Sequence, residues 1–417
     1  MDYNEGTFRR SNLTPEFEDD YISSMPENVI TYILDRVPIQ YAVRTCTLSS
    51  KWRFKWTLLS QLTFDRDFFL YLAKKGISKD FEKIVNRILL QHKGDVTKFS
   101  ISLYSNSAAE CISDWVMFLS RNKIKHLAIK NIVVSPCTLP THLFSCVELK
   151  HLMLSNVSVS PMPRTFHGFP NLLSLVLIQV VFESCTYGEL LTRCPLLEIL
   201  NLSSDTTDNI KVFEFAKLEN LRELCLPLCE LGNRGMITSF DVLQHMSLFS
   251  KLQELRLDFL KCKVLVKSKE RFQTLLPCIK ALELYNLDFS CANMVSLAYA
   301  LIMASRNART LNISFKEDEA EDADDVDDMD DEDDVCDMAD IDCRRMGHLQ
   351  LREVSIENVT SSENEILLLK YLLSSSPLLK EMEVSSVSSK VPSRLVTLSK
   401  KLLKLHRASP IAEIHLY

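Results

Sequence analysis

The sequence predicts an α/β solenoid, in which parallel strands stack into a ladder joined by returning helices, behind a small N-terminal helical unit. The main observation is a short phrase of the form L-x-x-L-x-L that recurs along the chain. The second is the scarcity of glycine, 8 residues in 417, which argues against phosphate loops, dinucleotide-binding turns and tight hairpins. The third is a run of helical spacing from Asp20 to Trp56, ahead of the first phrase.

The N-terminal run begins with a helix-start signal, Met25-Pro26-Glu27. Proline at the first helical position gives up an N–H that has no partner there, and an acid favours the positive end of the helix. Apolar residues then follow at the spacing of one helical face until Pro38 ends the run: Val29, Ile30, Ile33, Leu34 and Val37.

Two further short helices are expected in the same run. One fits residues 40–47, and another opens near Ser49 or Ser50 and carries Trp52 and Trp56 on one side. Three such helices form a very small core, below the size at which an isolated domain is usually stable. The unit is therefore expected to bury its apolar faces against a partner.

Residues 20–56 resemble the F-box, which combines a Leu-Pro pair, an I-x-x-I-L helix, a second Leu-Pro, a Val-Arg-Thr-x-x-Leu-Ser segment and a closing Trp. Met25 and Val37 replace leucines, and Ser50 replaces a basic residue; apolar exchanges of this kind are usually tolerated. The resemblance implies binding to a Skp-type adaptor, and through it to a cullin. The alternative is a helical cap for the repeats. The implied adaptor-binding residues are Pro26, Ile30, Ile33, Leu34, Val37, Pro38, Val43, Leu48 and Trp52.

The recurring phrase predicts the ladder directly. The last two apolar residues of each phrase lie two apart, so both point to one side of a strand, and stacked strands build a continuous leucine core. The phrases resemble the leucine-rich repeats of plant F-box proteins, as does Arg193-Cys194-Pro195-Leu196-Leu197-Glu198; an unrelated α/β solenoid is the alternative. The phrases are Ile124-Leu127-Ile129, Leu149-Leu152-Leu154, Leu172-Leu175-Leu177, Leu197-Leu200-Leu202, Leu221-Leu224-Leu226, Leu252-Leu255-Leu257 and Ile279-Leu282-Leu284.

An acidic insert interrupts the repeats. Glu317 to Asp342 holds 17 acids and neither Lys nor Arg, so the rest of the chain is basic although the whole has a net charge of −7. Phrases resume at Leu351-Val354-Ile356, and the C-terminal segment resembles the FBD domain of plant F-box proteins. The expected division is a disordered tail (1–19), the F-box (20–60), leucine-rich repeats (61–315), the acidic disordered insert (316–345) and an FBD-like cap (346–417).

Residues that alternate with the buried leucines are expected to face a partner. Exposed clustered apolar side chains mark binding sites, so Met153, Val176, Ile178 and Ile199 are the best candidates, although cover by a loop is an equal alternative. The series runs from basic, through apolar, to mainly acidic. The predicted target-binding residues are His126, Lys130, His151, Met153, Val176, Ile178, Ile199, Glu223, Glu254 and Arg256.

No catalytic, metal or cofactor motif is present, and the pair His126 and His151 lacks a third ligand. The acidic insert would repel nucleic acid, and the longest apolar run is too short for a membrane. Thirteen cysteines without a C-x-x-C motif favour reduced thiols and a cytoplasmic or nuclear location. The resemblance implies a non-catalytic substrate receptor of a Skp-cullin-F-box ubiquitin ligase, with an unidentified protein target. A ligase-independent scaffold and a small-molecule co-receptor are the alternatives.

Overall fold

The computed structural model divides the chain into two compact units, Met1–Lys98 and Phe99–Tyr417. The predicted N-terminal tail and, Lys316 aside, the predicted acidic insert lie outside the residues that the structure describes. Within the described residues, the helices are all too short or too polar to cross a membrane. The described residues are 24–48, 52–183, 187–203, 218–227, 236–238, 249–260, 263–265, 276–316, 348–386 and 392–417.

The first unit begins with the first two predicted helices, each of which follows a proline. The carbonyl of Pro26 accepts the backbone N–H groups of Val29 and Ile30 at 3.0 and 3.1 Å, and Pro38 plays the same part for the second helix. Both prolines thus occupy the position where a missing N–H has no consequence. The α-helices of the unit are α2 (Glu27–Leu34), α3 (Ile39–Arg44), α4 (Arg66–Lys74) and α5 (Phe81–Gln91). Its other elements are η1 (Thr45–Thr47), η2 (Lys55–Leu58), β1 (Gln61–Phe64) and η3 (Ser78–Asp80).

The third predicted helix is shorter than expected. Ser49 and Ser50 lie outside the described residues, and the chain from Trp52 forms a turn and then the 3-10 helix η2. Trp52 and Trp56 are nevertheless both buried, at 5% and 6% exposure. Two indole rings supply much of the apolar area of so small a core.

The first unit extends beyond residue 61, where the sequence placed the start of the repeats. The backbone N–H groups of Lys93 and Gly94 donate to the carbonyl of Thr57 at 2.9 and 3.2 Å. The carboxylate of Asp35, just after α2, accepts from the backbone N–H and the hydroxyl of Ser60 at 2.8 and 2.7 Å. The bonds of Lys93 and Gly94, with those of the Thr97 and Lys98 N–H groups to the carbonyl of Ser60 at 2.9 and 3.1 Å, tie the segment after α5 to the predicted F-box, and the unit accordingly extends to Lys98.

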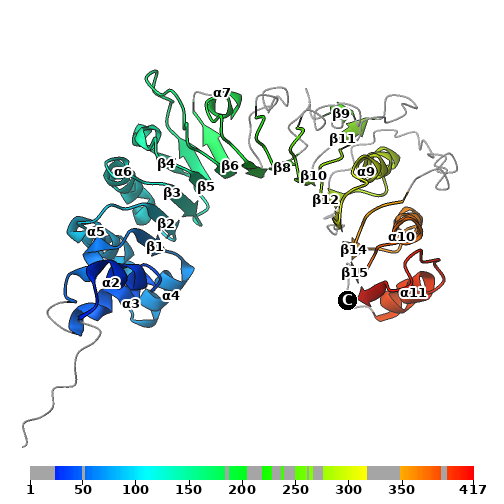
Figure 1. Cartoon of the computed structure of the whole chain (residues 1–417), viewed down its shortest axis with the longest axis horizontal. Coiled ribbons are helices and arrows are strands. Elements are labelled where there is room, and N and C mark those ends of the chain that lie inside the picture. Colours follow the sequence, from blue (N-terminus) through cyan, green and yellow to red (C-terminus); the bar gives the residue numbers. More distant parts are fainter. Residues whose placement is uncertain are drawn as a thin grey trace, which may run out of the picture. The chain divides into compact units, whose positions relative to one another are not determined.

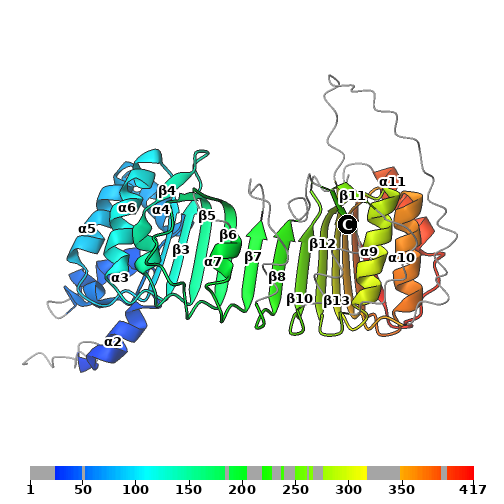
Figure 2. The ribbon, with the colours of Figure 1, turned by 90° about the horizontal axis from the view of Figure 1, so that it is seen from above.

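The second unit is the predicted ladder. Its strand order is β2-β3-β5-β6-β7-β8-β10-β12-β13-β14-β15-β16, with β4 beside β5, and Figures 1 and 2 show the strands side by side. From β3 onward the pairs are parallel. The strands are β2 (Lys98–Leu103), β3 (His126–Asn131), β4 (Cys137–Leu139), β5 (His151–Val159), β6 (Ser174–Phe182), β7 (Ile199–Ser203), β8 (Glu223–Pro227), β10 (Glu254–Asp258), β12 (Ala281–Leu287), β13 (Thr310–Phe315), β14 (Glu353–Val359), β15 (Glu381–Ser386) and β16 (Glu413–Leu416).

Helices cover one face of the ladder. Figure 1 shows α9, α10 and α11 on the same side of the strands, and the described residues place no helix on the opposite side. A separate pair, β9 (Met236–Thr238) and β11 (Lys263–Leu265), is also parallel. The helices and 3-10 helix of this unit are α6 (Asn106–Ser120), η4 (Thr141–Ser145), α7 (Tyr187–Leu191), α9 (Ala292–Ala304), α10 (Glu363–Ser375) and α11 (Pro392–Leu402).

The core lies where the repeated phrase predicts it. Leu175 and Leu177 of β6 are fully buried, and in each of the seven phrases all three apolar residues are at most 2% exposed. In register, Leu152, Leu175 and Leu200 follow one another on adjacent strands. The predicted fold class, an α/β solenoid behind a helical N-terminal unit, is confirmed.

Several strands bend at an asparagine in the left-handed conformation. Asn156, Asn286 and Asn358 have φ of 53°, 57° and 62°, and each lies two residues after a buried Leu or Ile of its phrase. Asparagine tolerates this region because its side chain bonds to nearby backbone. The Asn358 amide donates to the carbonyl of Phe315 on the neighbouring strand at 3.2 Å. The bends thus turn these strands at the same point and link each to the preceding strand of the ladder.

The C-terminal region consists of β14, α10, β15, α11 and the final strand β16. Helix α10 starts with a capping box, in which Glu365 bonds back to the N–H of Ser362 at 3.0 Å and Ser362 accepts from the N–H of Glu365. Glu365 is 3% exposed, and its carboxylate also accepts from the N–H of Thr360 at 3.0 Å. A buried carboxylate is tolerated because these donors satisfy it.

Candidate functional site

The first candidate surface lies on the F-box-like helices, and the structure sorts its nine predicted residues by depth. Ile30, Leu34 and Trp52 are buried in the core of the unit. Val37 and Val43 are half-buried, whereas the remaining four residues are exposed: Pro26, Ile33, Pro38 and Leu48. Only the exposed and half-buried members can contact a partner without unfolding the unit.

Several exposed apolar residues were not among the predicted ones. Helix α2 is apolar on two sides: Ile30 and Leu34 face the core, while Val29 and Ile33, also four apart, face solvent. A helix that is apolar all round is normally buried on both sides, and this signal could have been read from the sequence. The "apolar surface" of the first unit consists of Met25, Val29, Tyr32, Ile33, Tyr41, Leu48 and Phe54.

Contacts within the unit hold part of this surface in place. The guanidinium of Arg36 lies 3.5 Å from the ring centroid of Tyr32, and the ring of Tyr41 meets that of Tyr71 edge-on at 5.9 Å. Lys55, near the C-terminal end of the predicted F-box, forms an ion pair with Glu27 of α2, and this pair lowers the pKa of Glu27. Exposed apolar side chains on a rigid frame are typical of a protein-binding surface.

The second candidate surface is the face of the ladder opposite the helices. All ten predicted target-binding residues lie on it, because each alternates with a buried residue of its strand. The rings of His126 and His151, on adjacent strands in register, stack at 4.4 Å with an angle of 8°. Burial and the charge of Lys150 lower the pKa of His151. A neutral His151 avoids like-charge repulsion within the stack.

The apolar candidates occupy the middle of this face. Met153 and Val176 pair in register, as do Ser155 and Ile178, and all four are half-buried. Their partial exposure leaves apolar area available to a partner without placing a large hydrophobic patch in water.

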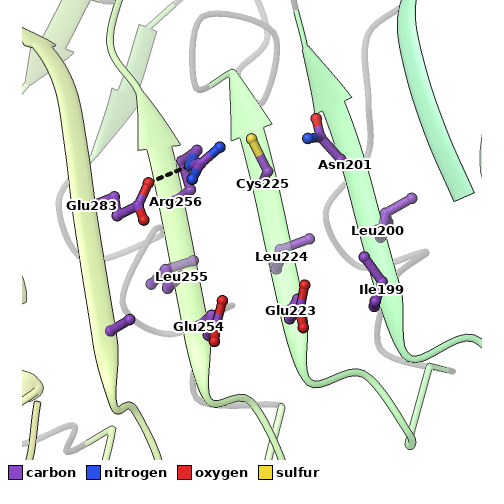
Figure 3. A pocket seen from close by; sticks show the side chains of 11 residues that line it. Ile199, Leu200, Asn201, Glu223, Leu224, Cys225, Glu254, Leu255, Arg256 and Glu283 are labelled. Atoms are coloured by element: carbon purple, nitrogen blue, oxygen red, sulfur yellow. Dashed lines mark hydrogen bonds and ion pairs between the residues drawn. The ribbon is translucent and has the colours of Figure 1, made fainter. Parts of the chain in front are cut away.

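The face becomes acidic from β8 onward. Figure 3 shows a shallow pocket in which Glu223 and Glu254 stand on neighbouring strands, with Arg256 directed toward Glu283. Burial, and then the charge of Glu254, raise the pKa of Glu223. Arg256 forms an ion pair with Glu283, and the hydroxyl of Tyr285 donates to the same carboxylate at 3.0 Å. Glu283 is thus neutralised within the protein, whereas Glu223 and Glu254 face each other without a cation among the described residues.

The described residues contain no group of three His, Cys, Asp or Glu side chains that could hold a metal ion. Their cysteines are free thiols. Burial raises the pKa of Cys146 and of Cys194 to about 12 and that of Cys225 to about 11. Such thiols remain protonated and unreactive at neutral pH.

Two family models match the chain. Residues 22–62 match the F-box domain, and residues 112–215 match the leucine-rich repeats of the FBD-associated F-box protein At5g56370. The chain is an F-box protein with leucine-rich repeats. The F-box match covers α2, α3, η1 and η2, and the repeat match covers β3 to β7.

Relatives of this F-box protein are found in Arabidopsis thaliana. It is 28% identical to the F-box/FBD/LRR-repeat protein At1g13570 over 95% of this chain and 98% of that one. It is 29% identical to the F-box/LRR-repeat protein At3g59210 over 53% of this chain and 47% of the relative. The first alignment is long enough to include the C-terminal region that resembles an FBD domain.

Among solved structures, a leucine-rich-repeat protein from Leptospira interrogans covers 93% of this chain and 97% of its own, at 13% identity and a TM-score of 0.37. The F-box domain itself implies a Skp-type adaptor as a binding partner.

Proposed function

We propose that this F-box protein is the substrate-recognition subunit of a Skp-cullin-F-box ubiquitin ligase. Its F-box binds a Skp-type adaptor, the adaptor binds a cullin, and the ladder face holds a protein target. The chain performs no bond chemistry; it raises the effective concentration of target lysines near an activated ubiquitin. Its place of action is the cytoplasm or the nucleus, where thiols such as those of Cys146 and Cys194 stay reduced.

The apolar surface of the first unit is the observation that carries this proposal. Tyr32, Leu48 and Phe54 are each at least 60% exposed although they are large and apolar. They belong to the segment that matches the F-box. A partner that covers them removes apolar area from water, at about 25 cal/mol per Å². The half-buried Val37 and Val43 would lie at the border of the contact.

Adaptor binding is expected to fall on the order of a hundredfold when Ile33 and Leu48 are both changed to alanine, since central apolar anchors dominate such interfaces. The measurement is the Kd of the full chain for a recombinant Skp-type adaptor by calorimetry. The control is Leu90→Ala, because Leu90 of α5 is 85% exposed but lies outside the F-box match. An equal loss in both variants, or no loss in either, would show that the apolar surface is not the adaptor site.

The ligase role needs a separate readout. In a reconstituted reaction with cullin and conjugating enzyme, a target captured from plant extract is expected to gain ubiquitin with the unmodified chain and not with Ile33→Ala/Leu48→Ala. Adaptor binding without ubiquitinated product would favour a ligase-independent scaffold. Capture that requires an added small molecule would favour a co-receptor.

A further inference from the structure

The acidic part of the ladder face continues well beyond the pocket of Figure 3. Among the ladder strands β8, β10, β12, β13, β14, β15 and β16, all but β13 carry at least one carboxylate on this face. Three of them, Glu353, Glu381 and Glu413, stand directly opposite one another on successive strands. Like charges in register on adjacent strands are destabilising. Within the described residues, His415 is the one basic side chain within 4.0 Å of this row, at 3.5 Å from Glu381 and 3.8 Å from Glu413.

A second pocket opens on this face between strands β12 and β15. It has a volume of about 300 Å³ and is lined by Tyr285, Asn312, Ile313, Ser355, Glu357 and Glu383. Glu383 of β15 pairs in register with Ser355 of β14, and Glu357 lies two residues after Ser355. The carboxylates of Glu357 and Glu383 therefore come from adjacent strands. Both are exposed, and within the described part of the chain neither has an ion-pair partner. We call this the "Tyr285 pocket".

The groups around the Tyr285 pocket differ in whether they are already paired within the protein. Glu283 is already occupied by Arg256 and by the hydroxyl of Tyr285, which fixes the tyrosine ring at the edge of the pocket. The negative charges of Glu283 and Glu357 contribute, after burial, to raising the pKa of Tyr285 to about 12, so the phenol stays neutral. The pocket therefore combines an aromatic ring, an amide, a hydroxyl and two unpaired carboxylates.

These groups match one kind of side chain. A cation next to an aromatic ring is attracted by its π-system, and ionised carboxylates bind ammonium and guanidinium groups by charge-assisted hydrogen bonds. The aliphatic stem of a lysine or arginine would pack against the ring of Tyr285. The described residues lack a three-ligand metal cluster, so a small ion would find too few ligands here.

We propose that the Tyr285 pocket takes a lysine or arginine side chain from a basic segment of the protein target, and that the carboxylates on β14, β15 and β16 hold further basic residues of that segment. This rests on the proposed function in one respect, namely that the bound segment belongs to the target. Neighbouring strands are about 4.8 Å apart, so an extended segment that crosses β14 to β16 meets a carboxylate on each strand.

The test uses the full chain and a fluorescein-labelled nine-residue peptide that alternates lysine with serine. Fluorescence anisotropy at low salt is expected to show binding that weakens as salt rises. The variant Glu357→Gln/Glu383→Gln is expected to bind on the order of tenfold more weakly, because two partly exposed charge contacts are lost. A peptide with glutamate in place of lysine is expected not to bind.

The matched control removes two exposed negative charges elsewhere in the same unit. Glu110→Gln/Asp114→Asn changes the net charge equally, but both residues lie on α6. Equal weakening in the two double variants would mean that net charge alone attracts the peptide, and the pocket would be rejected. The same holds if the unmodified chain does not bind the lysine peptide, or if Glu357→Gln/Glu383→Gln binds it as tightly as the unmodified chain.

Failure of this proposal can be separated from failure of the proposed function. Glu357→Gln/Glu383→Gln is expected to keep its affinity for the Skp-type adaptor, because both residues are outside the F-box match. Peptide binding without adaptor binding would overturn the ligase role and leave the pocket. Adaptor binding and ubiquitination of a target without peptide binding would overturn the pocket and leave the ligase role.

Discussion

Leu34→Ala is expected to destabilise the N-terminal unit by about 2–5 kcal/mol, because it leaves a cavity in a small and tightly packed core. Leu34 is 2% exposed and shares this core with Ile30, Trp52 and Trp56. Denaturant unfolding of the full chain can be followed by tryptophan fluorescence, since two of its three tryptophans are in this unit. An early transition at lower denaturant is the expected result.

The control for this prediction is Leu90→Ala, which removes the same atoms from an 85% exposed leucine of the same unit. Its effect is expected to stay within about 0.5 kcal/mol. If Leu34→Ala kept the midpoint of the unmodified chain but lost the adaptor, Leu34 would be a contact residue, contrary to its burial. Loss of adaptor binding in Leu34→Ala is otherwise a consequence of unfolding.

Gly168→Ala is expected to destabilise the second unit by at least about 2 kcal/mol, from backbone strain and steric overlap together. Gly168 has φ of 120°, and a Cβ there would lie 2.2 Å from the carbonyl oxygen of Arg193. That carbonyl also accepts the N–H of Phe169 at 3.1 Å. Because the obstacle is hydrogen-bonded backbone, it cannot move aside as a flexible side chain would.

Gly76→Ala separates the two causes. Gly76 also has positive φ, 72°, but a Cβ there meets nothing within 4 Å. Its effect should be limited to conformational strain of about 1 kcal/mol. Circular dichroism during thermal unfolding measures how far each variant lowers the transition of its own unit relative to the unmodified chain, and a shift in Gly168→Ala no larger than that in Gly76→Ala would contradict the predicted overlap.

The ladder could be predicted from the sequence because one local rule repeats. Each phrase places apolar residues two apart, and a strand with that pattern has only one way to bury both. The burial of Leu200 and Leu202 of β7 in the core could therefore be predicted without knowing which distant residues they contact. The start of α2 after Pro26 could be predicted for the same reason, since a proline restricts its own backbone.

The depth of the F-box residues could not be predicted in this way. Ile30 and Ile33 are equivalent in sequence, yet one is 4% and the other 40% exposed. Which side of α2 faces inward depends on Trp52 and Trp56, which follow it by more than 15 positions, and on the bond between Asp35 and Ser60. Such tertiary contacts override local spacing.

A local signal was also missed at the asparagine bends. Asn156 and Asn358 each fit the pattern N-x-S/T. Each also lies two residues after a buried leucine or isoleucine of its phrase, and an asparagine at that position predicts a left-handed backbone conformation. The Tyr285 pocket needed the structure, because its residues come from four strands over about 100 positions of sequence.

The reactivity of the buried thiols in the ladder would report local opening of its repeats. Cys146 and Cys194 lie in different repeats, and burial, which raises their pKa, keeps them from reacting while their repeat is closed. A repeat array is held mainly by neighbour contacts, so its ends and middle can open independently. The order in which these thiols react with an alkylating reagent, against the exposed Cys278, would therefore trace where the array begins to come apart.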